Sequence, residues 1–416
     1  MPVRPDPRSA RPRGLALIAL VMVLLLGAHL AWLGALLAGG VQQQAARAHL
    51  HSLQARTAAE AGLAWAQAAL NATGALDARC EPASPAQGGR ILRTRWMASS
   101  DSPSALRPAC RRAGSRWACD CPDQGEGQPG PGTSDLNEPA FGMRLEAQDR
   151  SRGLWRLTVD GCSQPGPDCG APQGPEPAAR HRLQVSLARA GGGLQAPQAA
   201  LSAVGSVALA GDAEVARTDP AGAGPAVQAG SAITVATPAR TLGPPGTPAE
   251  AARRGGDVRL AEGAEPVWPR LAGLPAARLP GMPGWTRLDC RSGGCPGTVL
   301  EALRAGHRLL WIEGDLQLDG QAWGTPQDPV LLAVRGRLQA NDTFSAHGLL
   351  IGDTVRLGPI GTGGRSRVQG AVLSLGEARI EGPIDLRHDA ALLARLTELA
   401  GTLLMVPGSW IDPPRR

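Results

Sequence analysis

Eight cysteines are the residues of this chain whose types and spacing point most directly to chemistry. Six lie between residues 80 and 169, and Cys290 and Cys295 follow. An even count favours disulfides if this part of the chain lies in an oxidising compartment. Cys162–Cys169 and Cys290–Cys295 are the simplest local pairs, and three pairings stay open for the others, Cys80, Cys110, Cys119 and Cys121. Cys119-Asp-Cys121 lacks further ligands at zinc spacing, so we predict no metal site.

The remaining polar residues do not form a catalytic pattern. The chain has no Gly-x-Ser-x-Gly or His-Glu-x-x-His motif, and all 42 basic residues are arginine, which excludes a P-loop lysine and a Schiff base. His388-Asp389 precedes a helical run, where capping is expected. Carboxylates in the second half are interpreted as scattered turn residues: Glu313, Asp315, Asp319, Asp353 and Glu381. We therefore predict a protein that is not an enzyme and uses no cofactor.

These cysteines follow an element that decides their compartment. Residues 15–38 form an uncharged apolar run of 24 residues that includes Leu15, Leu26, Trp32 and Ala38. About 20 apolar residues span a bilayer, whereas the apolar core of a signal peptide is about 7–15 residues long. The run therefore predicts a retained transmembrane helix. Its one ionisable residue, His29, has no acidic partner in the span, which favours a neutral, hydrogen-bonded imidazole.

A basic leader precedes the apolar run. Residues 1–14 carry four arginines against a single aspartate, so the positive-inside rule places this leader in the cytoplasm and the bulk of the chain outside it. The net charge of +6 is otherwise spread along the chain without a basic cluster. We therefore predict no specific nucleic-acid partner.

A helical stalk is expected directly after the membrane span. Residues 41–71 are rich in alanine, leucine and glutamine and contain no proline. Apolar residues recur at helical spacing in one stripe: Leu50, Leu53, Ala59, Leu63, Ala66 and Leu70. Asn71 to Gly74 supply stop residues, so one helix of about 58 residues is predicted.

An antiparallel sheet is expected to complete the first unit, which spans residues 39–190. Short alternating runs predict strands at 90–96, 141–146, 155–159 and 181–187. Stretches rich in proline and glycine, at 121–134 and 163–178, predict exposed loops between them.

A different pattern follows a predicted linker at residues 191–200. Within residues 201–388 a glycine, one or two small or polar residues and then alternating apolar residues recur, starting at Gly205, Gly256, Gly314, Gly336, Gly352 and Gly376. Repeats of this kind predict a mainly β domain, either a β-solenoid or a β-sandwich. Residues 389–416 are predicted to form a C-terminal helix and tail. The fold class is therefore α+β.

The N-terminal pattern resembles a known family. Arg13-Gly14-Leu15-Ala-Leu-Ile18 before the apolar run and the stalk motif Ala58-Ala59-Glu60-Ala61-Gly62-Leu63 are similar to PilX-type type IV pilus assembly proteins, which are minor-pilin-like. The resemblance implies a long helix whose first half inserts in the membrane and whose second half packs on a periplasmic sheet. It also implies cleavage between Gly14 and Leu15, but Ala19 stands where such chains carry a glutamate.

The resemblance continues into the second half of the chain. Similar proteins have matching stretches at 200–207, 310–316, 329–334 and 368–372, and the ending Pro407-Gly408-Ser409-Trp410 is similar to the family's terminal signature. Trp410 is expected either to dock a partner or, more simply, to pack over the end of the second domain.

Function follows from the resemblance as an expectation. It implies a structural component of type IV pilus assembly in the bacterial inner membrane, with other pilins, the assembly platform and the lipid bilayer as partners. A membrane-anchored adhesin and a minor pseudopilin of a type II secretion system remain the alternatives.

Overall fold

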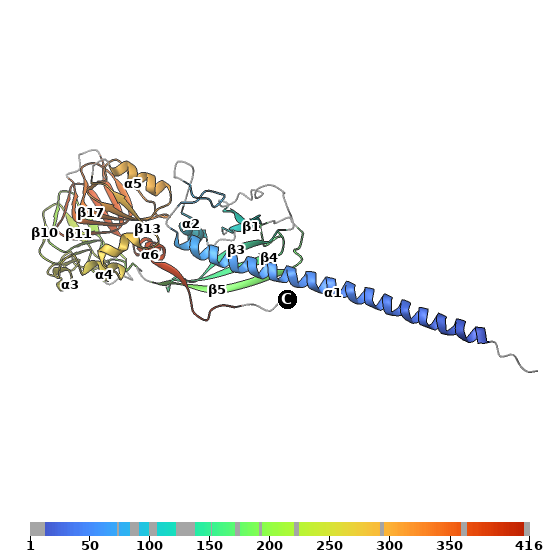
Figure 1. The fold of residues 1–416 in the computed structure, drawn as a ribbon. Helices are drawn as coiled ribbons and strands as arrows, with labels where there is room; N and C mark the ends of the chain where they lie inside the picture. The colour runs from blue at the N-terminus through green and yellow to red at the C-terminus, as the bar shows by residue number, and fades with distance from the viewer. Residues whose placement is uncertain are drawn as a thin grey trace, which may run out of the picture.

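The computed structural model describes residues 13–72, 75–83, 91–99, 106–121, 138–150, 152–170, 175–190, 194–219, 224–291, 295–358 and 364–411. A long helix projects from two β units, which lie one beyond the other along the direction of the helix (Figure 1). The leader residues 1–12 lie outside the described part of the chain.

Helix α1 runs without interruption over Arg13–Asn71 and is about 88 Å long at 1.5 Å per residue. The single helix that joins the apolar run to the stalk is therefore present. Burial on the first β unit begins only at Ala55 and continues through Ala59, Leu63, Ala66 and Leu70. The expected stripe is wrong at its start, because Leu50 and Leu53 are 54% and 48% exposed.

The first unit, which we call the head, contains a six-stranded antiparallel sheet, the head sheet, in the order β2-β1-β3-β4-β5-β22. Its strands are β1 (Ala109–Ala113), β2 (Arg116–Asp120), β3 (Ala140–Asp149), β4 (Leu154–Cys162), β5 (Arg180–Ala190) and β22 (Thr402–Met405). The strands predicted at 141–146, 155–159 and 181–187 lie within β3, β4 and β5. One face of the sheet packs against α1, with Phe141, Leu157 and Leu187 in the shared core.

The predicted strand at 90–96 is wrong. Leu92–Ser99 form helix α2, whose residues Leu92, Trp96 and Met97 are buried in the same core as α1 and the sheet. Adjacent side chains of a strand point to opposite faces, so a strand could not bury both Trp96 and Met97 in one core, whereas adjacent residues of a helix lie only about 100° apart and residues four apart share a side. The burial of Leu92 together with Trp96 and Met97 is therefore helical.

The second unit is built from parallel strands. Its sheet contains β6 (Leu201–Ala203), β7 (Val207–Ala210), β8 (Glu214–Ala216), β9 (Val227–Ala229), β10 (Ile233–Val235), β11 (Arg240–Leu242), β12 (Arg253–Arg254), β13 (Trp285–Asp289), β14 (Leu309–Glu313), β15 (Leu316–Gln317), β16 (Ala322–Trp323), β17 (Val330–Ala340), β18 (Ser345–Leu357), β19 (Ser366–Ser374), β20 (Ala378–Glu381) and β21 (Ile384–His388). Every pairing in this sheet, within the described residues, is parallel. Leu309 pairs with Leu331 and Leu201 with Val227, so the chain returns to the same line after 22 and 26 residues. We call this unit the coiled unit.

The chain enters the coiled unit in the middle of the stack. Strand β6 pairs on one side with β9, the next strand on its line, and on the other side with β19, near the end of the unit. Strands β7 and β8 likewise pair with β20 and β21. Residues 201–254 therefore extend the stack in one direction, and residues 285–388 return from its opposite end to the point of entry.

Both faces of the central strands are buried. Leu332 and Val334 of β17 point into the interior of the coil, whereas Leu331 and Ala333 pack outward against helices. The covering elements are α4 (Val267–Ala272), the 3-10 helix η2 (Ala276–Gly281) and α6 (Ala390–Leu399). Helix α5 (Cys295–Arg304) contributes Val299 and Leu303 to the interior. Double-sided burial is typical of parallel sheets.

Two further expectations fail in this unit. Residues 256–260 do not form a repeat strand, because Asp257 caps the short helix α3 (Val258–Ala261) by accepting hydrogen bonds from Arg259 N and Leu260 N. In the predicted linker, residues 194–200 are not free, since Leu194, Ala199 and Ala200 are buried. Residues 191–193 lie outside the described part of the chain.

The C-terminal segment does not form a separate tail. Helix α6 packs on the coiled unit, and the chain then returns to the head sheet, where β22 pairs antiparallel with β5 (Figure 1). The coiled unit is thus inserted between two neighbouring strands of the head sheet.

Candidate functional site: the anchor helix and its contact with the head

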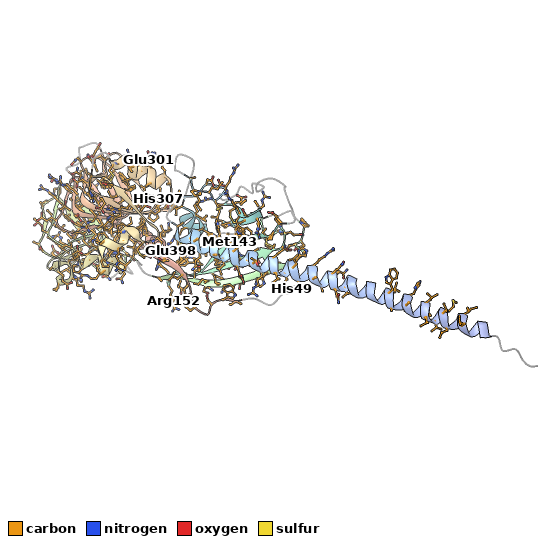
Figure 2. All side chains as sticks on the ribbon, in the orientation of Figure 1. His49, Met143, Arg152, Glu301, His307 and Glu398 are labelled. Atoms are coloured by element: carbon orange, nitrogen blue, oxygen red, sulfur yellow. A yellow bond between two sulfur atoms is a disulfide. The ribbon has the colours of Figure 1, made fainter. Side chains whose placement is uncertain are left out.

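The first half of α1 is exposed on all sides over residues 17–34, including Leu26, His29 and Trp32. Within the described residues, α1 is the one helix long and apolar enough to cross a membrane. The side chains of Gly14, Leu15 and Ala38 lie outside the described part. The side chains stand off the helix into empty space until the region of His49, where α1 reaches the head (Figure 2).

Helix α1 contacts the head sheet through glycine and alanine. A Cβ atom on Gly62 would lie 2.7 Å from Val159 Cγ1 and 2.8 Å from the Phe141 ring. A Cβ atom on Gly161 of β4 would overlap the backbone of Ala55 and Ala59. The helix backbone therefore rests directly on the strand, and small residues are required on both sides.

The predicted stalk motif lies at this contact. Ala58, Ala59 and Leu63 are buried, and Gly62 makes the close approach. Glu60 points away and forms an i,i+4 ion pair with Arg56 at 3.0 Å. One side of the motif thus packs on the sheet, and the opposite side faces solvent.

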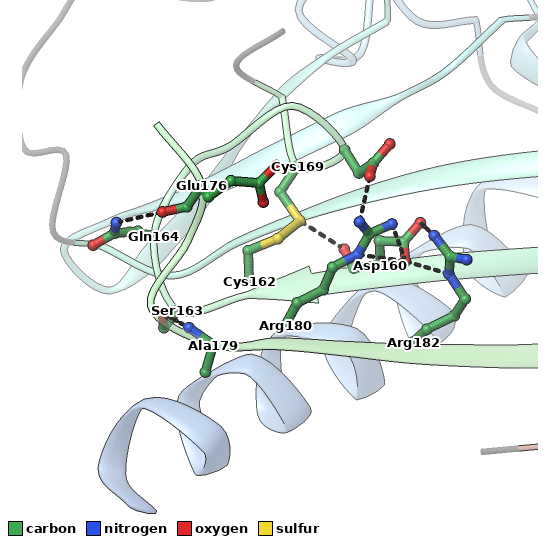
Figure 3. Close-up of a disulfide and its surroundings, with 10 residues drawn as sticks. Asp160, Cys162, Ser163, Gln164, Cys169, Glu176, Ala179, Arg180 and Arg182 are labelled. Carbon is green, nitrogen blue, oxygen red and sulfur yellow. Dashed lines mark hydrogen bonds and ion pairs between the residues drawn. A yellow bond between two sulfur atoms is a disulfide. The ribbon is translucent and has the colours of Figure 1, made fainter. Parts of the chain in front are cut away.

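On the opposite face of the sheet, Asp160 holds β4 and β5 together beside Gly161 (Figure 3). The carboxylate is buried and binds Arg182 Nε at 2.6 Å and Arg180 Nη2 at 2.9 Å. Arg180 also binds Asp168 at 2.5 Å. The hydrogen bond from Arg182 to Asp160 raises the pKa of this guanidinium. Charge-assisted bonds of this kind fix the strand at the point where α1 crosses it.

All eight cysteines are paired. The local pairs Cys162–Cys169 and Cys290–Cys295 are present, and the other bonds join Cys80 to Cys121 and Cys110 to Cys119. Cys110 and Cys119 are direct partners on β1 and β2. Cys169 Sγ, which carries no hydrogen in the disulfide, lies 3.2 Å from the carbonyl oxygen of Asp160, so this loop closes over the Asp160 group (Figure 3). Such pairing is typical of an oxidising compartment.

The coiled unit is fastened to the head by side chains that bind the α6–β22 connection. Arg93 of α2 is buried and donates to the carbonyl oxygens of Gly401 at 2.7 Å and Ala400 at 3.4 Å. Arg189 of β5 donates to the carbonyl oxygen of Thr397, and Arg150 pairs with Glu398 at 2.5 Å. Burial lowers the pKa of Arg93 to about 10, with Arg189 as the lesser cause. Figure 2 places Glu398 and His307 at this junction.

The binding of α6 by arginines has a simple electrostatic basis. The last carbonyl groups of a helix have no partner within the helix and carry partial negative charge, so cations are favoured there. Three arginines from the head, Arg93, Arg150 and Arg189, meet this end of α6. They were not predicted, because nothing in their local sequence indicates that a helix terminus lies beside them.

The C-terminal signature lies on the head sheet. Ser409 accepts a hydrogen bond from Ser186 N at 3.1 Å, and Ile411 pairs with Gln184 of β5. Trp410 is 47% exposed. The expectation that Trp410 packs over the end of the second domain is therefore wrong, because its chain segment has already returned to β5.

The carboxylates predicted to lie in turns of the coiled unit each have a local partner. Glu313 accepts from Trp311 Nε1 at 2.8 Å, and this bond is the main reason that its pKa is lowered. Asp315 and Asp319 accept from backbone N–H groups, Asp353 faces Arg335 at 3.5 Å, and Glu381 pairs with Arg379 at 3.1 Å. Asp389 caps α6 by accepting from Leu392 N at 2.9 Å. In the part of the chain that the structure describes, no three His, Cys, Asp or Glu residues are placed to hold a metal.

Comparison with known proteins adds little to this geometry. No family model matches the chain, so membership of the PilX-type family is not supported, and no curated protein matches it. The crystal structure of the competence-associated pilin ComZ from Thermus thermophilus aligns with 87% of this chain and 97% of its own, at 14% identity and a TM-score of 0.23. A TM-score this low carries no argument about fold or function.

Proposed function

We propose that this protein is a minor-pilin-like structural component of type IV pilus assembly. Residues 15–38 anchor it in the bacterial inner membrane as a single-pass helix, and the head lies on the periplasmic side. The observation that carries the proposal is α1 itself: one helix is bare and apolar over residues 17–34 and packed on an antiparallel sheet from Ala55 onward. A bare apolar helix end is stable in lipid or in the core of a fibre, where its surface is removed from water.

The coiled unit is, in this proposal, a β-solenoid that the assembly presents at the fibre tip. Its support is the arrangement of parallel strands in register and the insertion at the end of the head sheet far from the membrane helix (Figure 1). We propose a structural role without catalysis. The partners would be other pilins and the assembly platform, both contacted along α1. Because residue 19 is alanine, the membrane-inserted half of the helix carries no carboxylate. The first acidic residue of α1 is Glu60.

A fractionation experiment tests this function. We expect the protein in sheared pili as well as in the inner membrane, and fewer pili when its gene is deleted. Recovery from membranes only, with unchanged pilus number and twitching, would contradict the proposal and favour a static membrane-anchored adhesin. Co-fractionation with a type II secretion pseudopilus would favour the pseudopilin alternative.

Cleavage of the leader is tested on the same material. We propose processing between Gly14 and Leu15, so N-terminal sequencing of the purified protein should begin at Leu15. Replacement of Gly14 by a bulky residue should leave the leader in place.

A further inference from the structure

The strands of the head sheet are not consecutive in the chain, because the sixth strand follows the coiled unit. Strands β1 to β5 end at Ala190, but the sixth strand, β22, begins at Thr402. Between them lies the whole coiled unit, residues 201–388. The head sheet therefore receives its last strand only from chain that follows the coiled unit.

Strand β22 fills a gap in the core of the head. Leu403 is fully buried in the cluster that contains Leu70, Trp155 and Leu187, and Met405 packs against the same cluster. On one side its backbone pairs with residues 187–190 of β5. Without β22, this edge of β5 and the end of α1 would lose their neighbour.

Asn71 makes the end of α1 depend on the same strand. Its side chain donates to the carbonyl oxygen of Leu403 at 2.9 Å and accepts from Leu403 N at 2.8 Å. The Asn71 amide thus bonds to the backbone of β22 as a neighbouring strand would, on the edge of β22 that faces away from β5. The last residue of the anchor helix is thus tied to the last strand of the head.

Placement of β22 requires a folded coiled unit. The connection to β22 begins at the end of α6, and α6 is held in place by Leu393 and Leu396, which are buried against the coiled unit. The arginines of the head bind this same stretch, at Thr397, Ala400 and Gly401. In the structure, docking of α6 on the coiled unit places these carbonyl groups beside the arginines.

We propose that β22 is a closing strand that couples completion of the head to folding of the coiled unit. While the coiled unit is unfolded, the head lacks Leu403, the edge of β5 is open and the C-terminal half of α1 is not fully secured. When the coiled unit folds, α6 delivers β22 and the helix is fixed on the sheet. The order of folding is defined, because the strands of the coiled unit do not pair with β22 and can form before it docks. It does not depend on the pilus role proposed above.

Hydrogen exchange on the full chain in detergent micelles tests this coupling. Three peptides report: the end of α1 (60–71), β5 (180–190), and β17 (330–340). Leu403→Ala should raise exchange in α1 and β5 at least about tenfold, whereas β17, which can stay folded when β22 leaves, should exchange more slowly than they do. Leu404→Ala, at the exposed neighbouring position, is the matched control and should change none of them.

A variant within the coiled unit tests the direction. Leu332→Ala opens a cavity in the interior of the coil and should raise exchange in β17 and also in β5 and α1. If β17 opens while β5 and α1 keep their protection, the head completes itself independently and the proposal is wrong. Equal exchange rates in α1 and β5 for Leu403→Ala and Leu404→Ala would overturn the proposal as well. If Leu403→Ala does not accumulate, Leu403→Val provides the same comparison with a smaller cavity.

Discussion

Asn71, the last residue of α1, exchanges two hydrogen bonds with the backbone of Leu403, which lies 332 residues later in the chain. The two residues belong to the first and the last regular elements of the protein. Their pairing shows that the head is built from both ends of the chain, with the coiled unit between them. The helix that carries the anchor is therefore fixed by contacts made by the final strand.

The close approach of α1 to the sheet predicts opposite effects for two glycines of the same helix. Gly62→Ala places a Cβ against Val159 and Phe141, so we expect a loss of about 1–3 kcal/mol in the free energy of unfolding of the head. Gly39→Ala, where no atom lies within 4 Å, should not destabilise the head and should favour the helix by about 1 kcal/mol. Thermal unfolding in detergent checks both. A Gly62→Ala protein as stable as Gly39→Ala would contradict the direct contact.

The Asp160 group predicts a strong effect of a single carboxylate. Asp160→Asn removes the negative charge shared by Arg180 and Arg182, and we expect a loss of about 1–3 kcal/mol. Glu146→Gln is the control, because Glu146 pairs with Arg144 at 3.1 Å on a half-exposed surface, where such pairs contribute little. Denaturant unfolding followed by tryptophan fluorescence compares them. Equal midpoints for the two variants would show that Asp160 does not hold β4 and β5 together.

Two histidines of the coiled unit predict loss of stability in mild acid. Burial lowers the pKa of His388, with Arg217 adding to the effect, while the Pro197 carbonyl, Asp219 and Asp389 oppose it. Burial and Arg308 also lower the pKa of His307. The unfolded chain therefore binds protons more readily below about pH 6.5, so stability is complete above this pH and falls as the pH decreases toward the folded pKa.

The same argument gives the variant to measure. His388→Gln removes one of these titrations, so the melting temperature should fall less steeply between pH 7.5 and 5 than in the unmodified protein. His49→Gln, on the exposed part of α1, should leave the slope unchanged. A slope that His388→Gln does not alter would assign the acid sensitivity to other groups.

The bare half of α1 predicts a position-dependent effect of charge. Leu26→Arg places a cation at the middle of the apolar run and should weaken insertion by about 3 kcal/mol, so that much of the protein leaves the membrane on alkaline carbonate extraction. Leu50→Arg changes another exposed leucine of the same helix, outside residues 15–38, and should leave membrane association intact. Loss of both variants from the membrane would place the span elsewhere.

The sequence predicted the elements that local patterns specify. The long apolar run and the alanine-rich stalk gave α1, and the strict alternation in 141–146, 155–159 and 181–187 gave three strands. The stretch at 90–96 misled because arginine and apolar residues alternate there, while the burial of Leu92 with Trp96 is decided by tertiary packing. Leu50 and Leu53 continue the helical stripe in sequence, but the sheet ends before it reaches them.

Long-range pairings could not be predicted for a different reason. Residues 402–405 form a short apolar run whose partner strand ends at Ala190, and nothing local to either segment specifies the other. The arginines at the end of α6 could not be predicted either. Arg93, Arg150 and Arg189 differ from other arginines only in their tertiary contacts, which their local sequence does not specify. The pairing of Cys80 with Cys121 could not be predicted for the same reason, because it depends on how the loop at 75–83 folds against the sheet.

Entry into the middle of the parallel stack divides the coiled unit into two arms. The arm of residues 201–254 ends away from the head, whereas the other arm contacts the head where Ile91 N donates to the carbonyl oxygen of Ala305 at 3.0 Å (Figure 1). The chain enters at β6 and leaves after β21, and these strands lie within the same layers of the stack, bound to each other through β8 and β19. Turns of coil added to or removed from the arm of residues 201–254, with a matching change in the connection from β12 to β13, would leave this central layer, and with it the attachment to the anchor helix, where it is. The reach of the protein is therefore adjustable by simple duplication or loss of turns, without redesign of the part that holds it to its base.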